Sequence, residues 1–521
     1  MSISSESVGK RDVQLDELLK GIDYLELAGN IKTGTTISMV SNDSRELLPS
    51  SMFVAVRGYC ADGHSFISSA IDRGAIAVIC EEFPSETGGI SCLFIKVSDT
   101  RQVLAVVAKL FYRNASDQLM IIGVTGTNGK TTTARLITDI LNANGIPAGY
   151  IGTNLCRIAG QSIALDRTTP EAHGLHALFA QMVEAGCRAT VMEVSSHALI
   201  LKRVYGIQFH AAVFTNLTME HLDFHETMEA YTLAKQQLFD QLSPDGFAVF
   251  NIDDPFALQM AARLMPQKIY YCTLQAGLCP ILGCSRYFLA EIIRRTLVST
   301  TVALHFPDVI VTIQLKLLGL FNVMNMLEAA AVGFGFGLVP DEICRVLSEV
   351  TVIEGRMERV GASGSGWHVF VDYAHTPDAL FKALSTLRKL KSESSILFVV
   401  FGCGGNRDKT KRFEMGRVAS EVADEVIITS DNPRDEDPES ILDEIERGII
   451  GNRYMRISNR SDAIRKAVSM LKSGDILLVA GKGHEKYQEV AGRKEFFSDR
   501  ECLLTCMYGN CSGYLEKENS L

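Results

Sequence analysis

The sequence predicts an α/β fold in three domains, on three observations. The chain has 521 residues, too many for one ordinary domain of roughly 100–200 residues. Its 47% hydrophobic and 21% charged residues are typical of a folded globular protein and exclude disorder, collagen and coiled coil. Short apolar runs alternate with helical patterns along the chain, as in mostly parallel sheets. We expect domains over residues 1–115, 116–350 and 351–521.

The charge balance and the termini limit the class of protein further. Fifty-one Lys and Arg against 61 Asp and Glu give a net charge of −10, which predicts no nucleic-acid partner. No signal-peptide pattern opens the chain, and no apolar run approaches the roughly 18 residues that a bilayer requires. Thirteen cysteines without a CxxC pair indicate reduced thiols. We expect a cytoplasmic monomer that does not insert into membranes.

The first domain is expected to be a small α/β unit. Apolar β-rich runs cover residues 51–56, 75–80 and 92–97, and the stretch FISSAIDRGA between the first two has a helical pattern. The second domain opens with a strand at residues 119–125 and a helix that ends near Gly145. Further strands are expected at 190–196, 211–217 and 247–254. Residues 275–315 lack clear turn residues that would bound helices or strands, so they stay unassigned.

The third domain is expected to be a Rossmann-like α/β unit. Apolar strands at residues 368–373, 395–402, 424–432 and 475–483 each lead into a loop that contains Gly, Asp or Asn. Such loops lie at the carboxyl ends of the strands, where open α/β sheets bind ligands. The sequence therefore places a ligand site at this edge of the third domain.

A phosphate-binding loop is predicted between the first strand and the first helix of the second domain. The sequence there is Gly126-Thr127-Asn128-Gly129-Lys130-Thr131-Thr132, a variant of the P-loop because Val124 stands where the pattern requires its first glycine. Backbone N–H groups and the helix N-terminus would hold phosphate oxygens, Lys130 would reach a terminal phosphate and Thr131 would bind Mg²⁺. A Gly-rich turn with an exposed lysine is the alternative.

Two features near this loop suggest a metal site. Glu193 ends an apolar strand, where its carboxylate could hold Mg²⁺. His221 and His225 lie four residues apart and could share a helical face as metal ligands, although a structural role is the simpler interpretation of His225.

Lys235 lies in a helix expected over residues 227–242, at a core-facing position that its spacing shares with Met228, Tyr231, Leu238 and Leu242. Burial would lower the pKa of this lysine and leave a neutral amine, which can react with carbon dioxide to give an anionic carbamate. The alternative is a lysine whose head extends to solvent.

Blocks along nearly the whole chain resemble the Mur ligase family. They are TGTNGKTT (125–132), TTPEA (168–172), EVSSHAL (193–199), FTNLTMEHLDFH (214–225), YTLAK (231–235), GLFNVMN (319–325), EGRMERV (354–360), DYAHTPDAL (372–380), FGCGGNRDKTKR (401–412), DNPRDEDP (431–438) and GKGHE (481–485). Residues 42–67 resemble the UDP-binding domain of the third-step enzymes. The resemblance implies an ATP-dependent amide ligase of peptidoglycan synthesis, and thus a role in cell-wall biogenesis, cell shape and cell division.

The resemblance also implies sites for ATP, Mg²⁺ and a UDP-muramoyl dipeptide. The nucleotide would be bound by Gly126–Thr132 with Asn325, Arg356 and His375, and the catalytic residues would be Lys130, Glu193, His221 and Lys235. Lys235 matches the family's carbamylated lysine (N6-carboxylysine) and would share the metal with Thr131 and Glu193. Uridine and the dipeptide would be bound by Ser44, Tyr59, Cys60, Ala61, Thr168, Thr169, Ser195 and Arg203.

The third domain is expected to select the amino acid that is added. The Arg434 guanidinium can grip a carboxylate through two hydrogen bonds, and Glu485 can accept hydrogen bonds from an ammonium. Together with the family pattern, these groups imply meso-diaminopimelate as the substrate, whereas DNPRDEDP alone is more typical of a solvated acidic turn. The implied binding residues are Arg407, Asp431, Asn432, Pro433, Arg434, Gly481 and Glu485.

Other functions stay open. They are a lysine-adding Mur ligase, a folylpolyglutamate synthetase, a nucleotide-binding scaffold without catalysis, and a metallohydrolase built on His221 and His225. The chain also departs from the family at Leu201, where relatives often have glutamine, and at Met219-Glu220, where the usual pair ends in aspartate. These departures affect substrate contacts or metal geometry more than the class of reaction.

Overall fold

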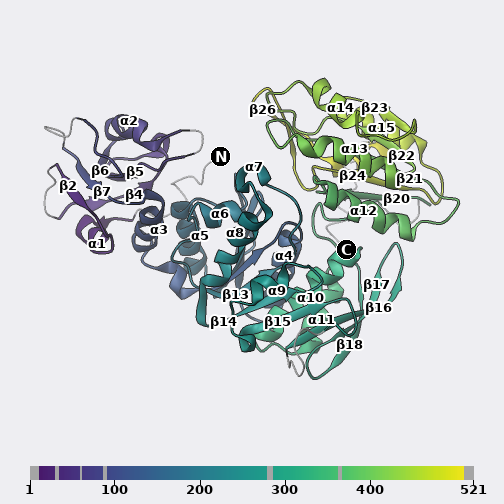
Figure 1. Cartoon of the computed structure of the whole chain (residues 1–521), viewed down its shortest axis with the longest axis horizontal. Coiled ribbons are helices and arrows are strands. Elements are labelled where there is room, and N and C mark those ends of the chain that lie inside the picture. The colour runs from purple at the N-terminus through teal and green to yellow at the C-terminus, as the bar shows by residue number, and fades with distance from the viewer. Residues whose placement is uncertain are drawn as a thin grey trace.

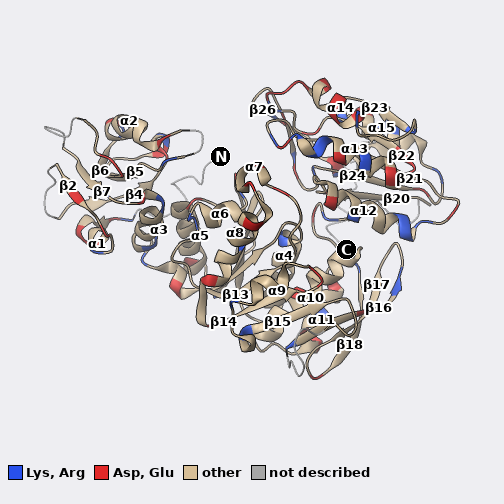
Figure 2. Cartoon of the chain, in the orientation of Figure 1, with Lys and Arg blue, Asp and Glu red and all other residues tan. Residues whose placement is uncertain are grey.

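The computed structural model describes residues 11–29, 34–58, 61–85, 91–278, 286–361 and 366–509. Its three α/β bodies follow one another along the chain, with the first and third on different sides of the central one (Figure 1). Acidic and basic residues are intermixed along the ribbons of all three bodies (Figure 2). Among the described residues, no helix combines the length and apolarity needed to cross a membrane.

The first body is a five-stranded sheet in the order β2-β7-β6-β5-β4, parallel except for β2. The strands predicted at residues 51–56, 75–80 and 92–97 are confirmed as β5, β6 and β7. A two-stranded sheet of β1 and β3 lies beside them. The elements are β1 (Val13–Gln14), α1 (Leu15–Lys20), β2 (Glu26–Ala28), β3 (Thr36–Ile37), β4 (Met39–Ser41), β5 (Ser51–Val54), α2 (Ile67–Asp72), β6 (Ala75–Cys80), β7 (Leu93–Lys96) and α3 (Thr100–Phe111).

The central body is an eleven-stranded sheet in the order β11-β10-β9-β12-β8-β13-β14-β15-β16-β17-β18. Strands from β9 to β16 in this order pair in parallel, and both edges are antiparallel. The unassigned stretch contributes β16, β17 and β18, an antiparallel meander that lengthens one edge. The strands are β8 (Met120–Thr125), β9 (Ala148–Gly152), β10 (Leu155–Ile158), β11 (Gln161–Ala164), β12 (Ala189–Glu193), β13 (Phe209–Phe214), β14 (Leu242–Asn251), β15 (Ile269–Thr273), β16 (Tyr287–Arg295), β17 (Thr300–His305) and β18 (Ile310–Leu315).

Helices cover both faces of this sheet, which confirms the doubly wound arrangement. Successive residues of β8 point to opposite faces, so Ile122 packs with α4, α10 and α11 whereas Ile121 packs with α5 and α8. The helices are α4 (Lys130–Ala143), α5 (Ala172–Glu184), α6 (Ser196–Ile200), α7 (Leu222–His225), α8 (Met228–Asp240), α9 (Ala257–Ala261), α10 (Leu320–Gly335) and α11 (Pro340–Glu349).

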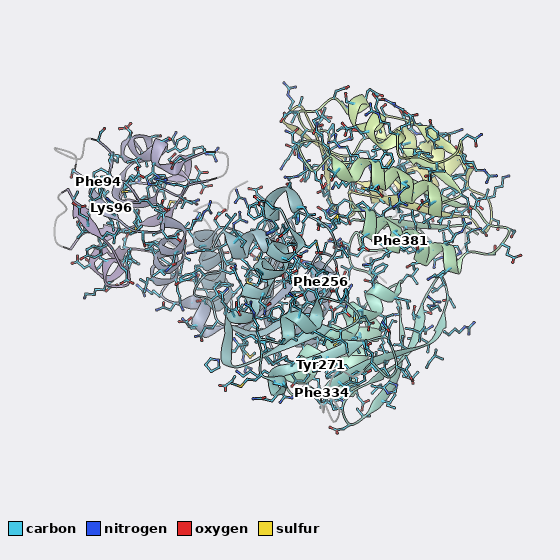
Figure 3. The ribbon with its side chains drawn as sticks, viewed as in Figure 1. Phe94, Lys96, Phe256, Tyr271, Phe334 and Phe381 are labelled. Carbon is cyan, nitrogen blue, oxygen red and sulfur yellow. The ribbon has the colours of Figure 1, made fainter. Side chains whose placement is uncertain are left out.

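The third body is a six-stranded sheet in the order β19-β20-β24-β21-β22-β23, antiparallel only at β19. Phe381 of its helix α12 lies on the side that faces the central body (Figure 3). The elements are β19 (Glu358–Val360), β20 (His368–Asp372), α12 (Pro377–Leu390), β21 (Leu397–Phe401), α13 (Thr410–Val422), β22 (Glu425–Ile428), α14 (Pro438–Glu446), β23 (Tyr454–Arg456), α15 (Arg460–Met470), β24 (Ile476–Ala480), β25 (Tyr487–Val490), β26 (Arg493–Phe496) and α16 (Asp499–Tyr508). The three main sheets fall within the predicted domain limits, which themselves stay predictions.

Candidate active site

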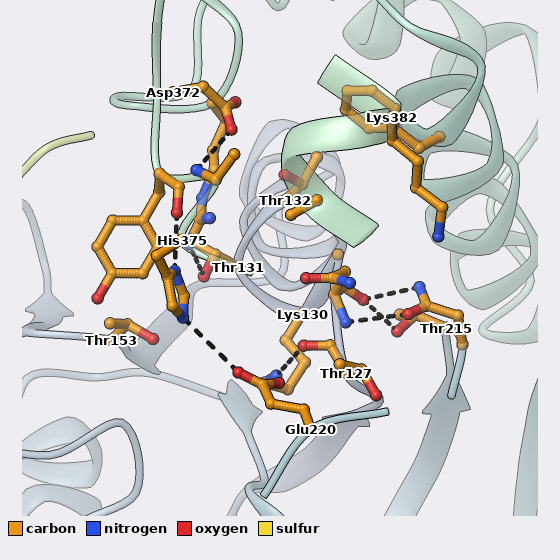
Figure 4. Close-up of a pocket in the computed structure, with 18 of the residues that line it drawn as sticks. Thr127, Lys130, Thr131, Thr132, Thr153, Thr215, Glu220, Asp372, His375 and Lys382 are labelled. Carbon is orange, nitrogen blue, oxygen red and sulfur yellow. Dashed lines mark hydrogen bonds and ion pairs between the residues drawn. The ribbon is translucent and has the colours of Figure 1, made fainter. Parts of the chain in front are cut away.

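A cavity of about 1100 Å³ lies between the central and third bodies. Its wall combines the P-loop, the carboxyl ends of central strands and the loops that follow the strands of the third body (Figure 4). Most of the predicted site residues meet here: Thr127, Asn128, Gly129, Lys130, Thr131, Thr132, Thr168, Thr169, Glu193, Ser195, Arg203, His221, Asn325, Arg356, His375, Arg407, Asp431, Asn432, Arg434, Gly481 and Glu485.

The remaining predicted residues do not line this cavity. Gly126 begins the P-loop, and Lys235 lies behind it and contacts the Gly126 carbonyl. Pro433 lies in the loop before Arg434. Ser44 is buried in the first body, and Ala61 belongs to that body too. Tyr59 and Cys60 fall outside the described residues. The proposed uridine site is therefore separate from the large cavity.

The P-loop turns from β8 into α4. A Cβ atom on Gly126, whose φ is +148°, would lie 1.9 Å from Thr215 Oγ1, so this position requires glycine. Lys130 Nζ donates hydrogen bonds to the carbonyl oxygens of Gly126 (2.9 Å) and Thr127 (2.8 Å). Burial lowers the pKa of Lys130. Its ammonium thus lies over the loop that is predicted to hold phosphates.

Glu193 is the centre of a network at the end of β12. Its buried carboxylate accepts hydrogen bonds from Tyr150 Oη (2.7 Å), Thr131 Oγ1 (2.9 Å), and the backbone N (3.0 Å) and Oγ1 (3.2 Å) of Thr153. Arg356 Nη2 donates to Thr131 Oγ1 at 3.0 Å. These contacts fix the carboxylate beside the P-loop.

The oxygens of Glu193 and Thr131 fit Mg²⁺, which prefers oxygen ligands. Among the described residues, no group of three or more His, Cys, Asp or Glu side chains could hold a metal ion. The protein would thus supply part of a magnesium shell, and phosphate oxygens of a bound nucleotide would supply more, as is usual for this ion.

Lys235 is a buried lysine on α8. It is 1% exposed, donates from Nζ to the Gly126 carbonyl at 2.9 Å and lies 4.5 Å from the centre of the Tyr231 ring. The alternative of a head that extends to solvent is therefore wrong. Burial lowers the pKa of Lys235 well below its ordinary value, and the nearby charge of Lys130 lowers it further. The predicted helix is also too long, because α8 ends at Asp240 and Leu242 begins β14.

Glu220 joins the two bodies across the cavity, a role that the sequence did not indicate. One carboxylate oxygen lies 3.7 Å from His375 Nε2 of the third body (Figure 4). The other lies 3.7 Å from His221 Nε2. Burial alone would raise the pKa of Glu220, but the nearby His375 imidazole and the charges of His221 and Lys130 outweigh it and lower the pKa. Glu220 is therefore a carboxylate at neutral pH.

His221 and His225, which could have shared a helical face, do not do so. His221 precedes α7 with a φ of +58°, in the left-handed region, so it lies outside the helix. His225 is 6% exposed, and its Nε2 lies 2.9 Å from Ser196 Oγ. His225 is held in the core, as the structural interpretation predicts, whereas His221 faces the cavity.

Thr169 links the predicted dipeptide residues to the end of β12. Its Oγ1 donates to the Glu193 carbonyl (2.9 Å) and accepts from the backbone N of Ser195 (3.2 Å). Arg203, which is 8% exposed, donates to the Thr169 carbonyl at 3.1 Å and pairs with Glu171 at 3.0 Å. Thr168 Oγ1 lies 3.1 Å from Thr153 Oγ1. These contacts place a buried cation next to the Glu193 network.

The predicted amino-acid residues gather at the carboxyl edge of the third sheet. Arg434 donates from Nη1 to the Gly405 carbonyl (2.7 Å), and its Nε lies 3.4 Å from a carboxylate oxygen of Glu489. A Cβ atom on Gly481, whose φ is +114°, would lie 2.5 Å from Asp431 Oδ2. Glycine thus allows the Asp431 carboxylate to approach the backbone. The sequence did not single out Lys482 beside it, although it belongs to the GKGHE block.

Family models match three successive parts of the chain. They are the catalytic domain of the Mur ligase family over residues 36–112, the Mur ligase middle domain over 124–333 and the glutamate ligase domain of Mur ligases over 355–483. The chain belongs to the Mur ligase family. It is 59% identical over 507 residues to a Mur ligase of Chlorobium phaeobacteroides named UDP-N-acetylmuramoyl-L-alanyl-D-glutamate–2,6-diaminopimelate ligase, covering 97% of this chain and 99% of that one.

A ligase of the same name from Chlorobaculum tepidum is 55% identical, over 96% of this Mur ligase and 98% of the relative. A solved structure of a ligase of that name matches with a TM-score of 0.66 at 32% identity, covering 95% and 99% of the two chains. A folylpolyglutamate synthase of Mycobacterium tuberculosis in complex with ADP shares the fold at 19% identity, with a TM-score of 0.58 over 72% of this chain and 90% of that one. These likenesses confirm the three-domain α/β fold and an ATP-dependent ligase.

Proposed function

We propose that this Mur ligase adds meso-diaminopimelate to UDP-N-acetylmuramoyl-L-alanyl-D-glutamate at the expense of ATP, in the synthesis of peptidoglycan precursors. The observation that carries the proposal is the single cavity that joins the P-loop, the Thr169 and Arg203 group and the Asp431 to Glu485 group. The names of relatives at 59% and 55% identity support the same substrates. We further propose that the enzyme works in the cytoplasm as a monomer.

The reaction needs two steps, because a carboxylate is a poor electrophile. An oxygen of the dipeptide's terminal carboxylate attacks the γ-phosphorus of ATP, and ADP leaves with the electrons of the broken P–O bond. The amine nitrogen of diaminopimelate then attacks the acyl carbon, loses its proton to the surrounding solvent or a basic group, and expels phosphate. Positioning and charge neutralisation carry most of such a reaction.

The nucleotide would lie on Gly126–Thr132, with Lys130 close to its terminal phosphate. Thr131 and Glu193 offer the oxygens that fit Mg²⁺, and a carbamate on Lys235 would be a second anionic group beside Glu193. When bound, this ion neutralises charge on the transferring phosphoryl group. Arg356, whose guanidinium lies 4.7 Å from the centre of the Tyr373 ring, would bring a further cation from the third body.

The carbamate on Lys235 follows from its lowered pKa. The neutral amine nitrogen would attack the carbon of carbon dioxide, and the proton lost from nitrogen would pass to water. The product carries a negative charge that attracts the Lys130 ammonium, whereas an ammonium on Lys235 would repel it. Burial that disfavours the ammonium thus favours the modification.

The amino acid would be bound by groups of both signs. Arg434 and Arg407 would take a carboxylate of diaminopimelate, and Glu485 and Asp431 would take an ammonium. Lysine has the second ammonium but lacks the second carboxylate, so Arg434 would favour diaminopimelate over lysine.

Phosphate release from ATP tests the proposal directly. The purified protein would be mixed with Mg²⁺, ATP and the UDP-muramoyl dipeptide, and then with meso-diaminopimelate, L-lysine or no amino acid. Release that only diaminopimelate stimulates, with a tripeptide product of the right mass, supports the proposal. Stimulation by lysine indicates a lysine-adding ligase, and no stimulation by either amino acid indicates a nucleotide-binding scaffold.

A further inference from the structure

Lys482 is a buried cation behind the amino-acid end of the cavity. It follows β24 between Gly481 and Gly483, and its side chain has no exposed surface. Its neighbours Gly481 and Glu485 line the cavity, whereas Lys482 lies behind this wall. An ammonium buried here needs partners, because burying an unpaired charge is costly.

Its partners are the groups proposed to hold the amino acid. Lys482 Nζ donates to Asn432 Oδ1 at 3.0 Å and lies 3.3 Å from Glu485 Oε2 and 3.8 Å from Asp431 Oδ1. Asn432 Nδ2 in turn donates to Glu485 Oε2 at 2.9 Å. Lys482, Asn432 and Glu485 thus form a closed triangle, which fixes the amide and the carboxylate from behind.

A second lysine offers a matched comparison. Lys482 Nζ lies 5.6 Å from the centre of the Tyr487 ring, and Lys494 Nζ lies 4.6 Å from the same centre. Lys494 is exposed, on the strand β26, and makes no hydrogen bond or ion pair with Asp431, Asn432 or Glu485. The two lysines therefore share an aromatic neighbour but differ in their contact with the carboxylates.

The charges around this end of the cavity balance when Lys482 is counted. The carboxylates are Asp408, Asp431, Glu485 and Glu489, and the cations are Arg407, Lys411, Arg434 and Lys482. A neutral set of charges suits the far end of diaminopimelate, which carries one ammonium and one carboxylate. Without Lys482, these groups carry an excess negative charge. That excess suits the far end of lysine, which carries an ammonium and no carboxylate.

We propose that Lys482 is a positioning residue that sets the choice of amino acid, because it balances one carboxylate of the subsite and fixes Asn432 and Glu485. This inference rests on the proposed function. Lys482 acts through its neighbours and does not itself bind the substrate. It therefore controls selectivity separately from Arg434, which would contact the distal carboxylate.

The test compares three variants with the unmodified enzyme in the phosphate-release assay. For Lys482→Met, we expect the ratio of kcat/KM for meso-diaminopimelate to that for L-lysine to fall roughly tenfold or more, with KM for ATP unchanged. Lys494→Met should leave the ratio as it is. In Lys482→Met/Glu485→Gln, the charges balance again, so activity with diaminopimelate should fall without the gain in relative use of lysine.

The double variant also guards against misfolding, since it leaves no excess buried charge, and thermal unfolding of each variant measures its stability. An unchanged ratio in Lys482→Met overturns the inference and leaves the proposed function intact. Equal relative use of lysine in the single and double variants also overturns it, because charge balance would then have no effect. An unmodified enzyme that diaminopimelate does not stimulate overturns the proposed function and this inference together.

Discussion

Lys130 and Lys235 donate hydrogen bonds to the same oxygen, the carbonyl of Gly126, each at 2.9 Å. Their nitrogens therefore lie within about 6 Å of each other, a separation at which like charges disfavour one another. Both side chains are also largely withdrawn from water, and the pKa of each is lowered. The arrangement leaves one cation for phosphate binding and one amine that can be modified.

Replacement of Lys235 tests this division of roles. We expect Lys235→Ala to lower kcat about 100-fold, because an anionic group beside the metal site is lost. Formate or acetate should restore part of the activity by occupying the space of the carbamate. The assay is phosphate release with and without the added acids, with Lys316→Ala, an exposed position, as the control. Full activity of Lys235→Ala would end the carbamate hypothesis.

The lowered pKa of Lys235 also predicts how stability changes with pH. In the unfolded chain this lysine has an ordinary pKa of about 10.4, whereas in the folded protein burial lowers the pKa. Between these two values the unfolded state binds more protons, so the free energy of unfolding rises with pH. Lys235→Met lacks this group, so its free energy of unfolding should rise less with pH.

Urea unfolding in buffer free of carbon dioxide measures the effect. The advantage in midpoint of Lys235→Met over the unmodified protein should be greatest at pH 7 and should shrink toward pH 10. An advantage that stays constant over this range would show that burial of Lys235 does not perturb its titration.

Glu193→Gln is expected to separate magnesium binding from folding. The amide keeps the shape of the side chain and can still accept hydrogen bonds from Tyr150 and Thr153, but it lacks the charge that holds a cation. We expect the Mg²⁺ concentration for half-maximal activity to rise at least about tenfold. Thermal unfolding without Mg²⁺ should change little. Equal Mg²⁺ dependence of both proteins would place the ion elsewhere.

The fold was predictable wherever strands were apolar and bounded by turn residues. The runs at residues 75–80 and 368–373 gave β6 and β20 almost to the residue, because each is buried and followed by a polar loop. The meander of β16, β17 and β18 was not predictable in this way. In β18, exposed Ile310 starts an alternation with partly buried residues, so only one face of this edge strand is buried.

Some residues of the site could likewise be predicted from the sequence, and others could not. The P-loop and Glu193 were predictable because their chemistry depends on local spacing and on the end of a strand. Glu220 and Lys482 were not, because their roles arise from contacts between distant segments: Glu220 meets His375 from 155 positions away, and Lys482 meets Asn432. A helical pattern did indicate the buried position of Lys235, although it overextended the helix.

Glu220 is expected to hold the third body in register with the P-loop. Glu220→Ala removes the carboxylate between His221 and His375, so we expect kcat to fall about tenfold. Glu220→Asp, which keeps the charge on a shorter side chain, should retain more activity. Small-angle scattering with the dipeptide and a non-hydrolysable ATP analogue should show that the third body closes less tightly on the central body in Glu220→Ala.

Glu229→Gln is the control, because Glu229 is an exposed carboxylate on the neighbouring helix α8. Closure and activity of Glu220→Ala equal to those of the unmodified enzyme would show that other contacts suffice to join the bodies.

Arg434→Ala should weaken the selection of diaminopimelate and leave nucleotide binding intact. The guanidinium lies near Gly405 and Glu489, in the third body, away from the P-loop contacts of the nucleotide. We expect KM for diaminopimelate to rise about tenfold or more and KM for ATP to stay the same. Arg447→Ala, at an exposed helix end, is the matched control. A parallel rise of KM for ATP would count against this assignment.

Gly481→Ala tests whether the backbone beside Asp431 must remain uncovered. The added Cβ would lie 2.5 Å from Asp431 Oδ2 at a φ of +114°, so the variant combines backbone strain with a clash. We expect it to lower the free energy of unfolding by about 1–3 kcal/mol and to raise KM for diaminopimelate. Gly492→Ala provides the comparison, because Gly492 has a φ of +72° and no heavy atom within 4 Å of its added Cβ. Strain alone lowers stability and leaves KM unchanged, which is the result expected for Gly492→Ala. A raised KM only in Gly481→Ala would therefore trace the effect to displacement of the Asp431 carboxylate. Equal KM values in both variants would contradict that displacement.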